Sequence, residues 1–194
     1  MKTQLTANQV SGRATGALIF TGFGALWLVA GFFCREDLTV QAGAGIALVT
    51  TGLALAAWNL IRRARLLERV PEDPATMRAF HWVNGGQWVV AFVVELVLAW
   101  LHLSAYGITA IAVIVGLHLF PLARIFRYPL HYVTGTAMVV WATVMAITQQ
   151  EHLQSMTAWG TGAILWISAA GTIMVALNAA RQAALSQGLA ARAS

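Results

Sequence analysis

The chain has 194 residues, of which 59% are hydrophobic and only 10% are charged, and its formal net charge is +5 at pH 7. A soluble globular domain carries roughly 25% charged residues, so this composition excludes an ordinary soluble protein. It predicts an integral membrane protein that forms one domain over residues 1–194. The single cysteine, Cys34, excludes an intrachain disulfide and a cysteine-based metal cluster.

Six apolar segments have the length of about 20 residues that a helix needs to cross the hydrocarbon core. Because strand-like alternation over ten-residue units is absent, we expect an all-α bundle of six transmembrane helices and not a barrel. The long connection over 62–79 contains Pro71 and Pro74, which interrupt a helix, and Pro121 is expected to end or kink the fourth one. The expected helices cover 14–33, 39–61, 80–101, 104–122, 130–148 and 157–179.

The lysine and arginine residues predict the orientation of this bundle, because cytoplasmic connections carry an excess of both. With a cytoplasmic N-terminus and six spans, both termini lie in the cytoplasm, and only Arg35 of the twelve basic residues lies outside. We therefore expect a multi-pass protein of the cytoplasmic (inner) membrane. The positive charge is a topology signal, so it does not indicate a nucleic-acid partner. The cytoplasmic basic residues are Lys2, Arg13, Arg62, Arg63, Arg65, Arg69, Arg78, Arg124, Arg127, Arg181 and Arg192.

Two pairs of segments resemble one another within the chain. The stretch "HWVNGGQWVV" (81–90) matches "HYVTGTAMVV" (131–140) without gaps at five positions, and the second and sixth segments share a Gly/Asn/Arg spacing. Both pairs join helices that run in the same direction, which favours three αα-hairpin repeats. Chance is the alternative, because valine and glycine are common in membrane helices. The shared spacing is that of Gly52, Asn59 and Arg62 with Gly171, Asn178 and Arg181.

Polar residues in the third expected helix fall on one face. At 100° per residue, His81, Asn84, Trp88, Glu95 and His102 lie within about 60° of one another, with Gln87 on the flank. Unpaired polar groups that face lipid are costly, so we expect this stripe to face the bundle interior and to line a polar cavity. The predicted substrate- or ion-binding residues are Glu95, Gln87, Asn84, His81 and Trp88.

Glu95 is the one acidic side chain inside an expected span, and no lysine or arginine inside a span is available to pair with it. Apolar surroundings favour the neutral form of a carboxyl group. An acid in this position is by default a proton, cation or substrate site. The alternative is a protonated carboxyl that hydrogen-bonds a neighbouring helix and has only a structural role.

Three histidines form a second candidate group, because His81, His118 and His131 are expected at similar depth near the cytoplasmic side. Imidazoles from consecutive helices suit Zn²⁺ or another metal that accepts nitrogen ligands. Together with Arg124 and Arg127 they would equally suit an anionic ligand. Bis-histidine haem ligation is a further alternative, and the remaining one is that the three histidines only cap helix ends or meet lipid headgroups.

No catalytic residue and no cofactor is predicted, because no nucleophile, zinc-protease or nucleotide-binding motif is present. The leading hypothesis is a small transporter or channel-like protein with a small-molecule or ion ligand, a lipid bilayer around it and a proton- or cation-sensitive Glu95. The alternatives are a metal- or haem-binding membrane enzyme or redox protein, and a non-catalytic assembly or sensory partner. Homo-oligomerisation is compatible with so small a bundle.

Overall fold

The computed structural model describes residues 7–64, 73–148 and 151–193, and these residues form helices and short connections without a strand. Six of the helices are long and apolar enough to cross a membrane, so the prediction of a helical membrane protein is confirmed. The elements are α1 (Ala7–Phe33), α2 (Val40–Ala64), α3 (Pro74–Trp100), the short 3-10 helix η1 (Ser104–Tyr106), α4 (Gly107–Ile125), α5 (Leu130–Thr148) and α6 (Leu153–Ala193).

The prolines agree with the prediction at one position and differ from it at another. Asp73 is not helical and Pro74 begins α3, so no continuous helix crosses this connection, as predicted; Pro71 lies outside the described residues. The Asp73 side chain accepts hydrogen bonds from the Ala75 amide (3.1 Å) and the Thr76 hydroxyl (3.2 Å). Proline suits this position because the amide hydrogen that it lacks would have no helical partner there. Pro121 lies inside α4, which continues to Ile125. Of the two predicted effects of Pro121, an end of the helix is wrong, since a membrane helix tolerates proline where its neighbours support the backbone, whereas a kink stays a prediction.

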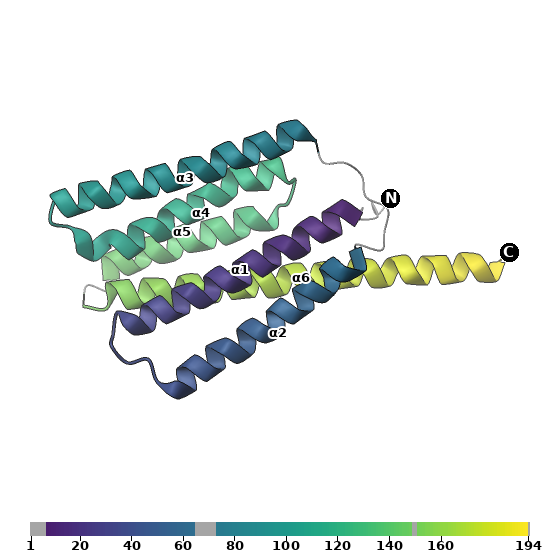
Figure 1. Cartoon of the computed structure of the whole chain (residues 1–194), viewed down its shortest axis with the longest axis horizontal. Helices are drawn as coiled ribbons and strands as arrows, with labels where there is room; N and C mark the ends of the chain where they lie inside the picture. The colour runs from purple at the N-terminus through teal and green to yellow at the C-terminus, as the bar shows by residue number, and fades with distance from the viewer. Residues whose placement is uncertain (1–6, 65–72, 149–150, 194) are drawn as a thin grey trace.

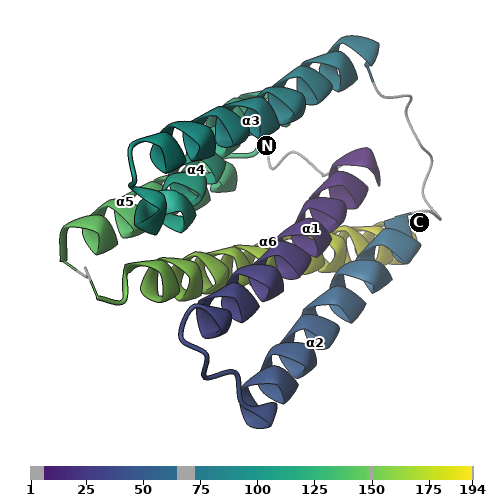
Figure 2. The same cartoon turned by 60° about the vertical axis from the view of Figure 1, so that its left-hand side comes forward.

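Helix α6 runs through the middle of the bundle, and α2 and α3 lie at opposite edges (Figures 1 and 2). Helix α1 begins and α6 ends at the same end of the bundle, which we call the terminal end (Figure 1). Helices α1, α3 and α5 end at the opposite end of the bundle, which we call the far end (Figure 1). At the terminal end α6 projects beyond the other helices (Figure 1).

The closest packing in the centre is between α1 and α6, where tryptophan rings lie on glycines. Trp166 packs on Gly24 and Trp159 packs on Gly31, so a Cβ atom at either glycine would collide with an indole ring. The Trp166 indole also donates a hydrogen bond to the Thr21 carbonyl oxygen (3.1 Å). Small residues let helix backbones approach, which supplies the packing energy that hydrophobic burial cannot provide inside lipid.

A second close approach joins α4 to α5. A Cβ atom at Gly116 would lie 2.9 Å from the Gly135 carbonyl oxygen and 3.2 Å from the Met138 Cβ, and Gly135 meets the Gly116 carbonyl in return. Ala112 and Ala142 are fully buried on the same two helices. The two helices therefore pack almost backbone against backbone.

Hydroxyl groups join α6 to the α4–α5 pair. Buried side chains on one face of α6 pair with buried side chains on α4, on α5 and just before α5, so their polar atoms are satisfied inside the bundle and not by lipid. The pairs are Thr109 with Thr157 (3.2 Å), Thr134 with Ser168 (2.8 Å) and Tyr128 with Thr172 (3.0 Å).

The glycine contact between α4 and α5 gives a stability prediction. Gly116→Ala should destabilise the folded protein by about 1–3 kcal/mol, because the added methyl group meets backbone that cannot move freely. Thermal unfolding in a mild detergent, followed by circular dichroism, measures the change.

Gly52→Ala is the matched control, because nothing lies within 4 Å of a Cβ atom at Gly52. It should leave stability unchanged or raise it slightly through helix propensity. Equal stability of the two variants would contradict the close approach of α4 and α5.

Candidate functional site

Helix α3, which carries the predicted polar stripe, packs against α4 and η1 at the edge of the bundle and has no buried residue. His81 and His102 are exposed, and Trp88 is 61% exposed. The prediction that the whole stripe faces the bundle interior is therefore wrong. The reason is that α6, with its small and hydroxyl-bearing residues, occupies the centre and leaves α3 with a single long neighbour.

Asn84, Gln87 and Glu95 are the part of the stripe that is partly buried. Since α4 is the long helix against which α3 packs, these side chains mark the junction of the two helices, which we call the α3–α4 seam. Asn84 and Glu95 are separated by about 16 Å along the helix axis at 1.5 Å per residue. The seam is thus a line of polar groups and not one binding centre.

The Glu95 carboxyl group lies against the start of α4. A Cβ atom at Gly107, the first residue of α4, would lie 2.8 Å from Oε2 and 3.1 Å from Oε1 of Glu95, so only glycine leaves room for the carboxyl group without a shift. Oε1 is buried and has no hydrogen-bond partner in the described part of the chain. Glu95 therefore lies in the last two turns of α3, toward the far end, with one oxygen left without a donor.

Two of the three predicted histidines come together. His118 of α4 lies beside the Val83 backbone of α3 and near His131 of α5. His81 lies beside Phe80, with ring centroids 5.6 Å apart, and Arg124 is exposed in the last turn of α4. Over residues 7–64, 73–148 and 151–179 no group of three His, Cys, Asp or Glu side chains is arranged to hold a metal ion. The candidate group of His81, His118 and His131 is thus not assembled as a three-ligand metal site, whereas haem ligation stays an alternative that nothing here tests.

His131 belongs to an aromatic cluster between α1 and α5 that the sequence did not reveal. Its ring is 5.0 Å from the Tyr128 ring and 5.5 Å from the Phe20 ring, measured between centroids, and the Arg13 guanidinium lies 4.7 Å above Tyr128. The Tyr128 hydroxyl donates to Thr172, and the His131 Nδ1 is buried without a hydrogen-bond partner among the described residues. The spacing of Tyr128 and His131 at a helix start is a signal for their contact, but nothing in the sequence points to Arg13.

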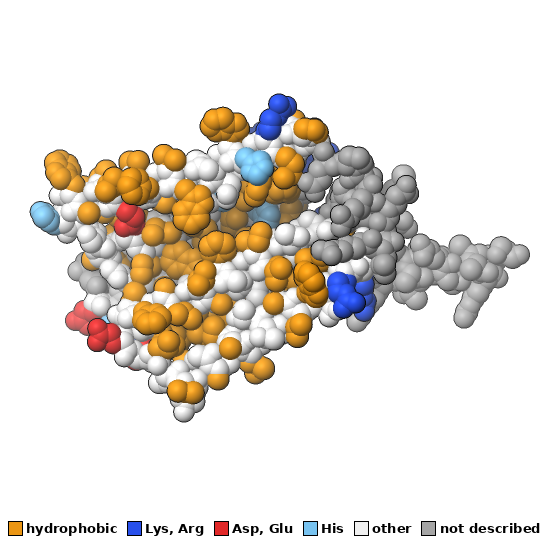
Figure 3. Space-filling view, viewed as in Figure 1, with side chains coloured by type: hydrophobic (Ala, Val, Ile, Leu, Met, Phe, Trp, Pro, Cys, Tyr) orange, Lys and Arg blue, Asp and Glu red, His pale blue; other side chains and the backbone are white. Residues whose placement is uncertain are grey.

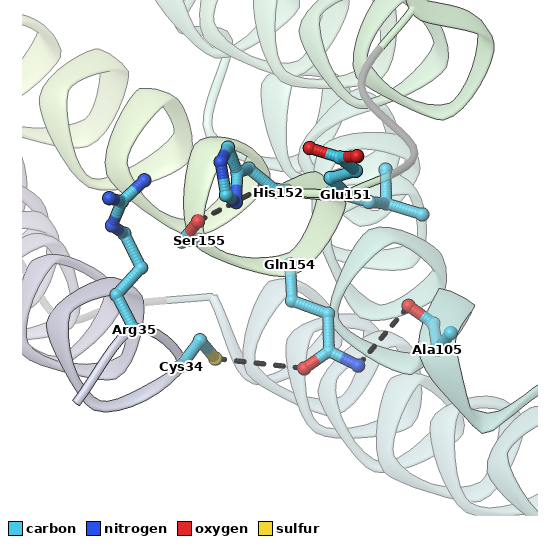
Figure 4. A pocket seen from close by; sticks show the side chains of 8 residues that line it. Cys34, Arg35, Ala105, Glu151, His152, Gln154 and Ser155 are labelled. Carbon is cyan, nitrogen blue, oxygen red and sulfur yellow. Dashed lines mark hydrogen bonds between the residues drawn. The ribbon is translucent and has the colours of Figure 1, made fainter.

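A pocket at the far end has a volume of about 160 Å³ (Figure 4). The Cys34 thiol donates to the Gln154 side-chain oxygen (3.7 Å), and the Gln154 amide donates to the Ala105 carbonyl (3.3 Å), so the start of α6 is bonded to the residue after α1 and to η1 (Figure 4). Burial raises the pKa of the Cys34 thiol, so the thiol is a hydrogen-bond donor here and a poor nucleophile. The lining residues are Cys34, Arg35, Ala105, Glu151, His152, Leu153, Gln154 and Ser155.

Comparison with known proteins gives no further assignment: the chain matches no protein-family model, no curated protein and no solved structure. The membrane architecture is thus the level of classification that the chain itself supports, namely a polytopic helical membrane protein.

The raised pKa of Cys34 gives a reactivity prediction. Because the thiolate is the reactive form, iodoacetamide should alkylate Cys34 in the folded protein more slowly than it alkylates glutathione near pH 8, and the rate should rise at higher pH than for glutathione. Mass spectrometry of timed samples measures the rate. Protein denatured in dodecyl sulfate is the control and should react like a free thiol; equal rates for folded protein and glutathione at every pH would contradict the burial of the thiol.

Proposed function

We propose that this protein is a small transporter or channel-like protein in which Glu95 is a proton or cation site on the α3–α4 seam. The observation that carries the proposal is the buried, unpartnered Oε1 of Glu95 within a membrane-spanning helix. Ionisable groups inside membrane helices are costly and typically mark ion or substrate pathways.

The missing hydrogen-bond partner of the Glu95 Oε1 atom supports a role in which a proton, a cation or a substrate binds there reversibly. A buried polar oxygen without a partner costs about 1–3 kcal/mol or more, and native proteins keep few such atoms. No described arginine or lysine forms an ion pair with Glu95; the one salt bridge among the described residues joins Arg35 to Asp37. A bound proton, a cation or a hydrogen-bond donor on a substrate would supply what the helices do not.

The seam supports a path from Glu95 toward the terminal end. Gln87 and Asn84 follow Glu95 along the partly buried side of α3, and His118 of α4 contacts Val83 beside Asn84. Amide and imidazole groups at such spacing can relay hydrogen bonds or coordinate a cation in steps. On the face shown in Figure 3, acidic and histidine side chains lie over α3 next to an apolar hollow between α3 and α1.

The peripheral position of α3 supports opening of this path. A helix that packs against one long neighbour loses fewer contacts when it moves than a central helix does, and elements with few buried contacts are the ones that open at low free energy. Displacement of α3 from α4 would admit water to Glu95, Gln87 and Asn84 without unpacking the contact between α1 and α6.

We further propose that the protein lies in the cytoplasmic membrane with its terminal end in the cytoplasm. The described arginines at the terminal end are Arg13, Arg62, Arg63, Arg78, Arg124 and Arg127, whereas Arg35 lies at the far end beside Asp37. This distribution follows the positive-inside rule.

Cys34 tests the orientation, because it lies just after α1 at the far end. A membrane-impermeant maleimide added to intact bacterial spheroplasts at alkaline pH should label Cys34, and the label should be read by mass shift. A Cys34→Ser protein with a cysteine in place of Arg63 is the control and should be labelled only after lysis. Labelling of this Cys34→Ser, Arg63→Cys protein in intact spheroplasts would reverse the orientation.

Glu95→Gln tests the transport proposal directly. Proteoliposomes with wild-type protein and trapped pyranine should take up protons under a valinomycin-imposed K⁺ potential faster than empty liposomes do. Glu95→Gln should reduce this uptake at least about tenfold, because the amide keeps the volume of the side chain but neither binds nor releases a proton at neutral pH.

Glu151→Gln is the matched control, since Glu151 is an exposed acid at the far-end pocket. It should leave the uptake rate unchanged, and all three proteins should elute as monodisperse species in detergent. Equal uptake by wild type and a folded Glu95→Gln variant, with Na⁺ and K⁺ gradients tested as well, would remove Glu95 from the mechanism.

A second candidate is an assembly or sensory protein, which is favoured by the absence of any buried residue on α3. In that case a partner helix would cover Asn84, Gln87 and Glu95, and Glu95→Gln would change the oligomeric state without affecting ion flux. Light scattering of wild type and Glu95→Gln in detergent therefore separates the two candidates.

A further inference from the structure

The aromatic cluster of Arg13, Phe20, Tyr128 and His131 near the terminal end contains one permanent positive charge, the Arg13 guanidinium, and no acidic partner among the described residues. Among the side chains that the structure describes, Arg13 makes one cation–π contact: its guanidinium lies 4.7 Å above the centroid of the Tyr128 ring. His118 adds a further imidazole next to His131. The described acidic residues lie elsewhere: Glu36, Asp37 and Glu151 are at the far end, Asp73 caps α3, and Glu95 lies against Gly107.

The cluster is held in a fixed shape. Tyr128 is buried, and its hydroxyl is tied to Thr172 of α6 at 3.0 Å, so its ring cannot turn away. Arg13 lies over the face of that ring and His131 meets it nearly at right angles, at 84°. One aromatic ring thus contacts both a guanidinium from α1 and an imidazole from α5.

Both polar groups have unused hydrogen-bonding capacity. The His131 Nδ1 is buried without a partner, and no hydrogen bond of Arg13 to a described residue is present. Arg13 is partly exposed, so it remains reachable from the surface. A guanidinium presents several donors in a planar fork that matches the oxygens of a phosphate group, and a neutral imidazole has one N–H group that can donate a further hydrogen bond.

We propose that Arg13 and His131 bind a phosphate group at the terminal end of the bundle, between α1 and α5. The phosphate belongs either to the headgroup of an anionic lipid or to a free phosphate in solution; the same donors serve both. Arg13 lies in the first turns of α1 and His131 in the first turn of α5, which is the depth where lipid headgroups meet a membrane helix. The site is separate from Glu95, which lies toward the far end.

Ligand-dependent thermal stability of the whole protein in a neutral maltoside detergent tests this site. Two probes are used: sodium phosphate against sodium chloride of equal ionic strength, and dioctanoyl phosphatidic acid against dioctanoyl glycerol, which lacks the phosphate. A ligand that binds only the folded protein raises its stability, so at saturating probe we expect the Tm to rise by about 3 °C or more. Arg13→Gln and His131→Asn should each abolish the rise.

Arg124→Gln is the matched control, because Arg124 is an exposed arginine at the same end of the bundle that lies outside the cluster. It should keep the full rise in Tm. Arg13→Lys retains the charge but not the planar fork, so it should keep a reduced rise; it also serves as the test should Arg13→Gln fail to fold.

The pattern of responses identifies the source of the phosphate. A rise with both probes supports binding of the phosphate group itself, a rise with the lipid alone supports a headgroup site, and a rise with sodium phosphate alone supports a soluble anion. The proposal is overturned if neither probe exceeds its control, if Arg124→Gln loses as much of the rise as Arg13→Gln, or if a folded His131→Asn variant keeps all of it.

Discussion

The close approach of α1 and α6 is the constraint on which the rest of the bundle depends. Inside lipid, apolar side chains gain little when they exchange contact with the acyl chains for contact with another helix. Helices therefore associate through tight packing. Gly24 and Gly31 provide the space, and Trp166 and Trp159 fill it. Because these rings come from α6, that helix is held in the centre, and the positions of α4 and α5 follow from it.

The second consequence of a central α6 is that most buried polar side chains find hydrogen-bond partners inside the bundle. Its hydroxyl-bearing face is paired with Thr109, Tyr128 and Thr134, so most of the buried polarity is consumed inside the bundle. The buried side-chain atoms without a partner among the described residues are Glu95 Oε1, His131 Nδ1, Trp159 Nε1 and Thr161 Oγ1. Two of the four belong to titratable groups, one toward each end of the bundle. Of these four atoms, only those of Glu95 and His131 belong to side chains that can exchange a proton near physiological pH.

The predictions from sequence fared differently for the helices and for the site. The predicted span 130–148 coincides with α5, because Pro129 before the apolar run and the polar residues after Thr148 mark its two ends. Helix α3 begins earlier than expected, because hydropathy does not register that Asp73 and Pro74 make a good helix start. The prediction that His81 and Trp88 face the bundle interior was wrong. A polar face of a membrane helix can also lie in the headgroup region or along the contact with one neighbouring helix. The hairpin repeats and the cytoplasmic position of the termini stay predictions.

The sequence by itself determined that this is a six-span helical membrane protein and that Glu95 is its unusual residue, because hydropathy and the cost of an intramembrane charge are local properties. Only the tertiary structure decided that α6 is central and α3 peripheral, that Glu95 lies against Gly107, and that Arg13 meets Tyr128 and His131. Those contacts depend on which small residues let two helices approach, and that is a property of pairs of segments distant in the chain. The glycine that receives a tryptophan is recognised only when both helices are in place.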